Sequence, residues 1–420
     1  MNKMKSFFLK IKENPKIRKV LYVSILVLML LYIFSIPSFS GRPKWNVVSY
    51  IFMGALGFAT FAYTLLYQKL MFNKQLLIPV IFAAFALIGT AIYSHQFRMW
   101  LTLILMCITM FVLFYAFTAI DNKRLIFKII IFAFLLFGFY FLFVYRNDFK
   151  SINLSYLRWG SYFDNVNTIG FYLSIAFTLS LYFCLTFNKK RELLYILPAI
   201  LFFALGILTG SRAFIVVAVV GALFILYLRL KNHIWIFIAV VASLTSLFII
   251  LINIPIFGFL RNQFDQTLFT LFGIGYSKVD TSTVQRMIWP EYAWFLGSKN
   301  MLIGYGCDGF SIFSGIGTYS HNNYSEVACN FGIIGLLLYY LAFASPMLFA
   351  LKPKEKDIYL VFVLAILYFT RSFFGVTYYS KDSYLILAIL YYLTNNCKIP
   401  YFTIRQRYVA GSQDFYEVSI

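Results

Sequence analysis

The sequence predicts an all-α polytopic membrane protein: a bundle of about twelve transmembrane helices with a large extracytoplasmic loop that carries short amphipathic helices. Composition is the first reason. Hydrophobic residues make up 61% of the 420 residues, charged residues make up only 12%, and the mean hydropathy is +0.80, which no water-soluble core of this size requires. The second reason is that apolar runs long enough to cross roughly 30 Å of hydrocarbon as helices recur almost to the C-terminus. Because lipid offers no partner to a free backbone N–H or C=O group, such runs favour helices.

Twelve apolar runs are candidate spans, and the last is the shortest. Together they make residues 1–420 a single membrane domain. The runs cover residues 20–36, 47–67, 75–93, 99–120, 125–145, 168–187, 192–209, 213–230, 234–253, 324–351, 357–373 and 383–394.

The net charge of +21 follows a membrane topology, which argues against a nucleic-acid partner and for contact with membrane lipids. Basic residues occur in segment 1–19, in the tail 395–420 and in every second short loop. By the positive-inside rule these parts are cytoplasmic, so both termini are predicted inside. The first apolar run has no small-residue cleavage site after it, and we interpret it as an uncleaved helix. The loop residues that set this pattern include Lys69, Lys74, Lys123, Arg124, Arg191, Arg229, Lys231 and Lys352.

Two loops on the opposite, outer side are long, 146–167 and 255–323. Long loops in compact proteins are usually functional or disordered. Aromatic residues recur over 288–295 at spacings that suit one face of an interfacial helix, so a short amphipathic helix is expected there. The chain has no P-loop, no dinucleotide fingerprint and no cytosolic segment large enough to build one, which places any chemistry on the outer side. The five cysteines show no metal-ligand spacing, and neither a cofactor nor a metal site is expected.

Three outer arginines are candidates for binding an anion. Arg158 precedes the sixth span, Arg212 lies in the tight turn between the seventh and eighth spans, and Arg286 lies in the second long loop. A guanidinium group presents a planar fork of donors that suits phosphate. Arg212 also precedes a helix at once, and helix N-termini attract anions. The alternative is that these arginines only anchor span ends at the interface.

One of only three histidines, His321, lies where the second long loop meets an apolar run. Asn323, followed three residues later by Glu326, resembles a helix start, which would put His321 and Asn322 just outside the first turn. A neutral imidazole there can accept a proton from a sugar hydroxyl, while carboxamides hold hydroxyl groups in place. The alternative is that all three polar residues only cap the helix. Gly332, further along this helix, is interpreted as a position of close helix packing.

These segments resemble the O-antigen ligase and O-antigen or capsular polysaccharide polymerase superfamily of bacterial membrane glycosyltransferases. The resemblance covers about residues 158–335. It rests on Arg158 with Asp-Asn-Val-Asn at 164–167, Leu-Thr-Gly-Ser-Arg at 208–212, Arg286 before Leu-Ile-Gly-Tyr-Gly at 302–306, and Ser-His-Asn-Asn-Tyr-Ser-Glu at 320–326 followed by Gly-Ile-Ile-Gly at 332–335.

The resemblance implies a metal-independent transferase on the outer face of the bacterial cytoplasmic membrane, with a glycan on undecaprenyl diphosphate as donor. It implies partners in the same pathway, a chain-length regulator and a flippase. His321 would be the base that deprotonates the acceptor hydroxyl, oriented by Asn322 and Glu326. The diphosphate would be bound by Arg212, Arg286 and Arg158. Positions that the resemblance assigns to placing the glycan or the loops are Asn165, Asn167, Ser211, Asn323 and Tyr305.

Alternative functions stay open at this point. A polymerase extends a lipid-linked chain onto another repeat unit, whereas a ligase hands the finished chain to lipopolysaccharide core or another acceptor. The motifs are common to both, and the polymerase is the reading we prefer. A lipid-linked oligosaccharide flippase would place polar groups near span midpoints, and here the candidates gather at outer ends. An inert scaffold would leave His321 and the arginines dispensable.

Overall fold

The computed structural model describes residues 14–39, 41, 43–68, 73–148, 159–186, 190–254, 261–262, 264–266, 268–269, 281–351 and 359–395. Within these ranges the chain forms helices and no β-strand, which confirms the predicted all-α class. Each of the twelve predicted spans corresponds to a helix. Arg158 and the terminal tails lie outside the described residues.

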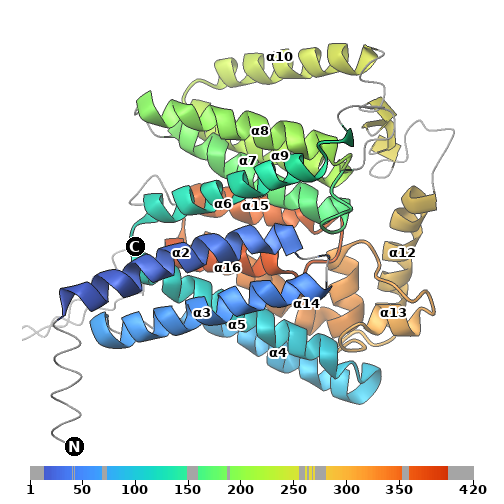
Figure 1. Ribbon diagram of the computed structural model, residues 1–420. Helices are drawn as coiled ribbons and strands as arrows, with labels where there is room; N and C mark the ends of the chain where they lie inside the picture. Colours follow the sequence, from blue (N-terminus) through green and yellow to red (C-terminus); the bar gives the residue numbers. More distant parts are fainter. Residues whose placement is uncertain are drawn as a thin grey trace, which may run out of the picture.

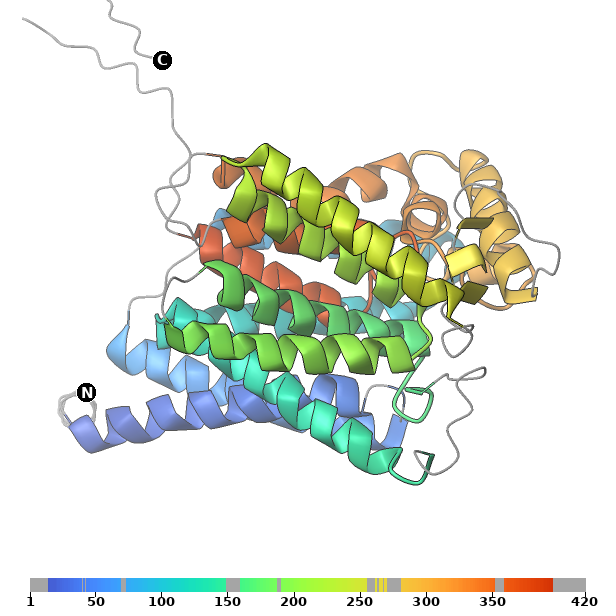
Figure 2. The same ribbon diagram turned by 90° about the horizontal axis from the view of Figure 1, so that it is seen from above.

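Long helices lie side by side and form the body of the molecule (Figures 1 and 2). Nine helical segments in the described ranges are long and apolar enough to cross a membrane, and α10, α15 and α16 complete the set. The helices of the body are α2 (Pro15–Phe39), α3 (Pro43–Tyr67), α4 (Leu77–Gly89), α5 (Phe97–Ile120), α6 (Lys123–Val144), α7 (Val166–Thr186), α8 (Ile196–Leu208), α9 (Arg212–Leu230), α10 (Ile234–Asn253), α14 (Asn323–Phe349), α15 (Tyr359–Arg371) and α16 (Lys381–Thr394).

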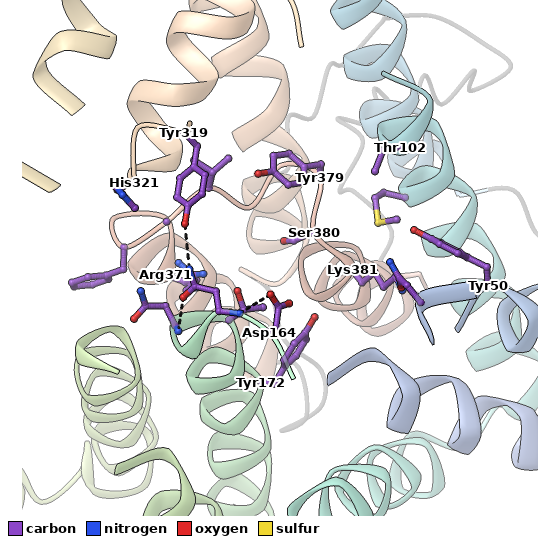
Figure 3. Close-up of a pocket in the computed structure, with 18 residues that line it drawn as sticks. Tyr50, Thr102, Asp164, Tyr172, Tyr319, His321, Arg371, Tyr379, Ser380 and Lys381 are labelled. Carbon is purple, nitrogen blue, oxygen red and sulfur yellow. Dashed lines mark hydrogen bonds between the residues drawn. The ribbon is translucent and has the colours of Figure 1, made fainter. Parts of the chain in front are cut away.

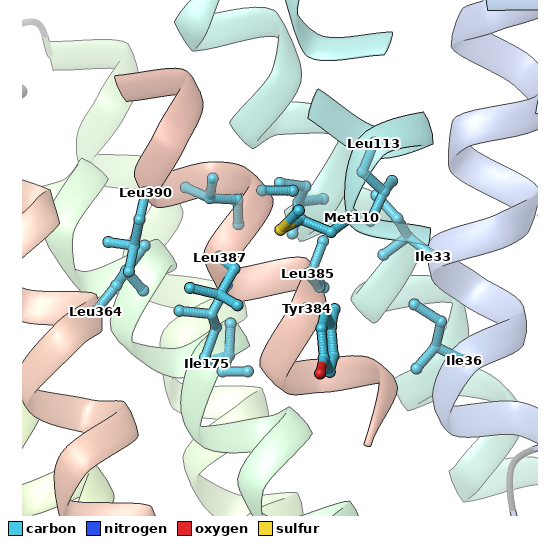
Figure 4. Close-up of a cluster of buried hydrophobic side chains, with 14 of the residues drawn as sticks. Ile33, Ile36, Met110, Leu113, Ile175, Leu364, Tyr384, Leu385, Leu387 and Leu390 are labelled. Carbon is cyan, nitrogen blue, oxygen red and sulfur yellow. The ribbon is translucent and has the colours of Figure 1, made fainter. Parts of the chain in front are cut away.

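The short helix α16 is the centre of the core. All of its residues are buried, and it packs mainly against α5, α15 and α14. Figure 4 shows Leu385, Leu387 and Leu390 of α16 among apolar side chains of α2, α5, α7 and α15. A helix enclosed by protein on all sides need not match the thickness of the hydrocarbon layer, which fits the length of only 14 residues that α16 has.

One end of the bundle carries the helices of the second long loop. Helices α12 (Thr281–Ser298) and α13 (Gly309–Phe313) lie across that end, where α12 packs against α14 (Figure 1). The expected helix over 288–295 is therefore present as part of α12. That it lies at the outer membrane surface stays a prediction, as do the sides on which the termini lie.

Helix α14 is interrupted at Gly332, whose φ of 64° and ψ of −170° are not helical. A Cβ atom at this position would lie 2.3 Å from the carbonyl oxygen of Leu302. The interpretation of Gly332 as a packing position is therefore incomplete, because this glycine also permits a backbone conformation that other residues avoid. The kink lets the loop at 302–306 pack against the first half of α14.

Candidate active site

A cavity of about 340 Å³ opens at the end of the bundle where the loop after α13 meets the start of α14. Its lining comes from five parts of the chain: the first turns of α3, the first half of α5, the start of α7, the loop at 319–321, and the segment from the end of α15 to the start of α16 (Figure 3). The residues that line it are Asn46, Tyr50, Thr102, Met106, Asp164, Asn165, Asn167, Thr168, Tyr172, Tyr319, His321, Arg371, Phe374, Gly375, Val376, Tyr379, Ser380 and Lys381.

His321 lines this cavity and is held between two aromatic rings. Its backbone has φ of 65°, a left-handed conformation that histidine adopts more readily than most residues. The imidazole stacks on the Trp289 ring, with centroids 5.2 Å apart and planes at 11°, and the Tyr319 ring meets it edge-on at 4.6 Å. Burial, together with the positive charge of Arg286, lowers the pKa of His321 to about 4. The imidazole is therefore neutral at physiological pH and free to accept a proton.

Helix α12 connects this imidazole to Arg212. Thr283, Arg286 and Trp289 recur every three residues and so lie along one face of the helix. At one end of this row, Arg212 Nη1 donates to Thr283 Oγ1 at 2.8 Å. At the other end, Trp289 stacks on His321, and the charge of Arg286 between them acts on that imidazole. Two of the three predicted anion-binding arginines thus lie along one line with the predicted base.

The start of α14 differs from the predicted arrangement by one residue. Asn322, not Asn323, is the N-cap: its Oδ1 accepts from the backbone N–H of Tyr324 at 2.9 Å and of Ser325 at 3.2 Å. Glu326 therefore falls one position too late for a capping box. Its buried carboxylate accepts instead from the Ser320 N–H at 2.7 Å, which secures the loop that carries His321.

Asn323 is fully buried and acts across the fold. Its Nδ2 donates to the Tyr340 hydroxyl at 2.9 Å, and its Oδ1 accepts from the backbone N–H groups of Thr377 and Tyr378 at 2.8 and 3.1 Å. The segment between α15 and α16 lines the cavity, so Asn323 positions one wall. Sequence spacing cannot show these hydrogen bonds, and the role of Asn323 in placing the glycan or the loops stays a prediction.

Two asparagines at the start of α7 line the cavity, Asn165 just before the helix and Asn167 in its first turn. Ser211 caps α9 and donates its hydroxyl to Asn167 Oδ1 at 2.9 Å, while Asn165 Nδ2 donates to the Tyr319 hydroxyl at 3.2 Å. These bonds connect the cavity to the N-terminus of α9 on one side and to the neighbour of His321 on the other. Tyr305 lies apart, against Tyr93 and Phe313, and does not line the cavity.

Three charged residues of the cavity were not among the sequence candidates. Asp164 stood within a motif considered above, and Arg371 is a charged residue at the end of an apolar run, which is a usable signal. Lys381 starts α16 and follows nine uncharged residues, so its burial could not be foreseen. Among the described residues, no group of three or more His, Cys, Asp and Glu side chains could hold a metal ion.

Comparison with known protein families places the region around this site. Residues 197–340 match the family model described as O-antigen ligase. The match includes Arg212, Arg286 and His321, and it ends before Arg371 and Lys381. No match was found among curated proteins. The match supports an enzyme of the O-antigen ligase or polymerase type, in a multi-pass membrane protein. The match over residues 197–340 therefore supports an O-antigen ligase-like superfamily for this part of the chain.

Proposed function

We propose that the protein is a polysaccharide polymerase of the outer face of the cytoplasmic membrane. It transfers a growing glycan from undecaprenyl diphosphate to a hydroxyl group of a lipid-linked repeat unit, without a metal ion. The observation that carries the proposal is the position of His321 at the cavity wall, stacked on Trp289 of α12, the helix that also carries Arg286. Glycosyl transfer to a hydroxyl needs this pair of features, a proton acceptor and a cation for the leaving diphosphate.

In the proposed step the acceptor hydroxyl oxygen bonds to the anomeric carbon of the donor. The bond from that carbon to the diphosphate oxygen breaks, and its electron pair leaves with the lipid diphosphate. The hydroxyl proton moves to His321. Arg286 and Arg212 stabilise the charge that develops on the diphosphate.

Binding of the donor should also change the pKa of His321. Burial comes first among the causes of the lowered pKa of His321, and the charge of Arg286 comes second. A diphosphate bound at Arg286 offsets that second cause and raises the pKa of the imidazole from its low value. A base whose pKa lies nearer to the working pH takes the proton more effectively, so the base is strongest once the donor is in place.

The test uses His321→Ala, Arg212→Gln and Arg286→Gln in the host strain, with chain length read from gels of the extracted glycan. We expect each variant to lose chain extension while still inserting into the membrane. Removing one donor of this kind typically costs 10²- to 10³-fold in rate. His233→Ala and Arg98→Gln are the matched controls, because both side chains are exposed and neither lines the cavity. Glycan of normal length in the first three variants would exclude the proposed roles.

Deletion of the chain separates the polymerase from the ligase. Loss of a polymerase leaves single repeat units on the normal acceptor, whereas loss of a ligase leaves long chains on undecaprenyl diphosphate. We expect the first pattern. The second pattern would identify a ligase, and an accumulation of single units on the cytoplasmic side would identify a flippase.

A further inference from the structure

The cavity carries two buried cations that the proposed transfer step does not use. Arg371 ends α15 and Lys381 begins α16, and their exposed fractions are 4% and 7%. Both line the cavity on the side of the α15–α16 segment (Figure 3), and both lie outside the segment that matches the family model. A buried cation is retained only where something offsets the loss of its hydration.

Arg371 has an incomplete set of hydrogen bonds. Its Nε and Nη1 atoms are buried without a hydrogen-bond partner among the described residues. The guanidinium carbon lies 5.5 Å from the centre of the Phe171 ring, and Asp382 is the acidic residue whose charge acts on the guanidinium group. An unpaired buried N–H group is costly, and more so on a charged group. The protein therefore holds a cation at the cavity wall with donor capacity that its own side chains do not fill.

Lys381 is held in place by two residues of α3. Its Nζ donates to Asn46 Oδ1 and lies 4.4 Å from the centre of the Tyr50 ring. Both partners belong to α3, so this contact joins the first turn of α3 to the start of α16. An amide oxygen and an aromatic face fix the ammonium group without neutralising it.

The charge balance of the cavity suits one negative charge. Asp164 is the single acidic residue in the lining, against two cations, while His321 is neutral, so the lining has a formal charge of +1. Asp382 is outside the lining but also acts on Arg371, so the excess positive charge of the cavity is at most one. A diphosphate would bring two or more negative charges towards Asp164, whereas one carboxylate matches the excess.

The other lining groups suit a sugar ring. Carboxamides, hydroxyl groups and tyrosine rings dominate, which gives both hydrogen bonds for sugar hydroxyls and flat apolar surfaces. The volume of about 340 Å³ lies within the range of small-molecule sites. The lining residues of these kinds are Asn165, Asn167, Thr102, Thr168, Ser380, Tyr50, Tyr172, Tyr319 and Tyr379.

We propose that this cavity is the acceptor subsite and that it selects a sugar with a single acidic group, of the uronic acid class. The carboxylate lies at Arg371 and Lys381, and a ring hydroxyl faces His321 on the other wall. The donor diphosphate lies on the far side of His321, along α12. This inference rests on the proposed function for the identity of the acceptor, but not for the binding of the acid.

Binding to the purified full chain in lipid nanodiscs tests the subsite without any transfer reaction. The probes are methyl glucuronide, methyl glucoside and inorganic diphosphate, with affinity read by calorimetry or ligand-observed NMR. We expect the glucuronide to bind about 10- to 100-fold more tightly than the glucoside, as one charge-assisted contact implies. Arg371→Met should abolish this preference. Equal affinity for the two glycosides overturns the proposal. So does a diphosphate that competes with the glucuronide and binds more tightly than the glucuronide.

Variants of Lys381 keep the test decisive if Arg371→Met does not fold. Lys381→Gln should reduce the preference at least about tenfold and Lys381→Arg should retain it, because only the second keeps the charge. His321→Ala should lose chain extension yet keep the preference for the glucuronide over the glucoside, because both sugars carry the hydroxyl that faces His321, so a failed subsite and a failed transferase give different results. Composition analysis of the glycan that disappears on deletion gives an independent check, and a glycan without an acidic sugar would refute the acceptor assignment.

Discussion

The imidazole of His321 lies nearly parallel to the indole of Trp289, with ring centroids 5.2 Å apart and planes at 11°. Trp289 belongs to α12 and His321 to the loop before α14, so this stack joins two segments at the end of the bundle. Because burial is the main cause of the low pKa of His321, the ring that covers the imidazole contributes to its protonation state.

Replacement of Trp289 should therefore change the titration of His321. In Trp289→Ala the imidazole gains water, and its pKa should rise from about 4 towards the ordinary value of about 6.5. Modification by diethyl pyrocarbonate requires the neutral imidazole, so its rate at each pH, read by mass spectrometry, gives the pKa. His95 and His233 serve as internal controls for the reagent, and Trp289→Phe should behave like the wild type. The same midpoint in all three proteins would disprove the role of the stack.

The pH dependence of transfer should report the same group. The base is the neutral form, so activity is lost as pH falls through the pKa of His321. In the free protein that value is about 4, so kcat/KM should stay level from pH 8 to about pH 5 as far as His321 is concerned. The acid limb of kcat should lie at higher pH, because the bound diphosphate offsets the charge of Arg286. An acid limb of kcat/KM near pH 6.5 would show that His321 is not the base or is not buried in the active protein.

Substitution of Asn322 distinguishes a capping residue from a catalytic one. The Asn322 side chain accepts two backbone N–H groups at the start of α14, so Asn322→Ala should reduce stability by about 1 kcal/mol. Asn322→Ser and Asn322→Asp retain an acceptor and should be close to wild type. Thermal unfolding in detergent measures the difference. Transfer that falls 100-fold in Asn322→Ser, at unchanged stability, would mean that the carboxamide contacts substrate.

The kink in α14 should not tolerate a side chain. In Gly332→Ala the backbone at φ of 64° and ψ of −170°, a conformation that essentially only glycine adopts, alone costs about 1–3 kcal/mol, and the new Cβ atom would also meet the Leu302 carbonyl oxygen. We expect a lower unfolding temperature in the same assay. Gly54→Ala is the matched control, because a Cβ atom there has no neighbour within 4 Å and alanine favours the helix. Equal stability of the two variants would contradict the strained conformation at Gly332.

The fold class and much of the site could be predicted from the sequence, for physical reasons. Apolar runs identify spans because, within lipid, a helix satisfies its backbone hydrogen bonds inside a single segment. His321 stands out because a histidine at a span end is rare. The predicted start of α14 was wrong by one residue. Asn322 and Asn323 are both good N-caps, and only the coordinates show which side-chain oxygen accepts the backbone N–H groups. Lys381 and Asn46 could not be paired, because 335 positions separate them and the spacing of either is uninformative.

The row of Thr283, Arg286 and Trp289 puts the proposed phosphate contact and the ring that covers the proposed base on one helix, α12. A helix moves as one body, so a shift that brings Arg286 towards a phosphate also changes how Trp289 covers the imidazole. Binding of the lipid diphosphate at Arg286 and uncovering of the His321 imidazole would then occur together. In the proposed mechanism, His321 would stay weakly basic and covered by Trp289 until the donor binds.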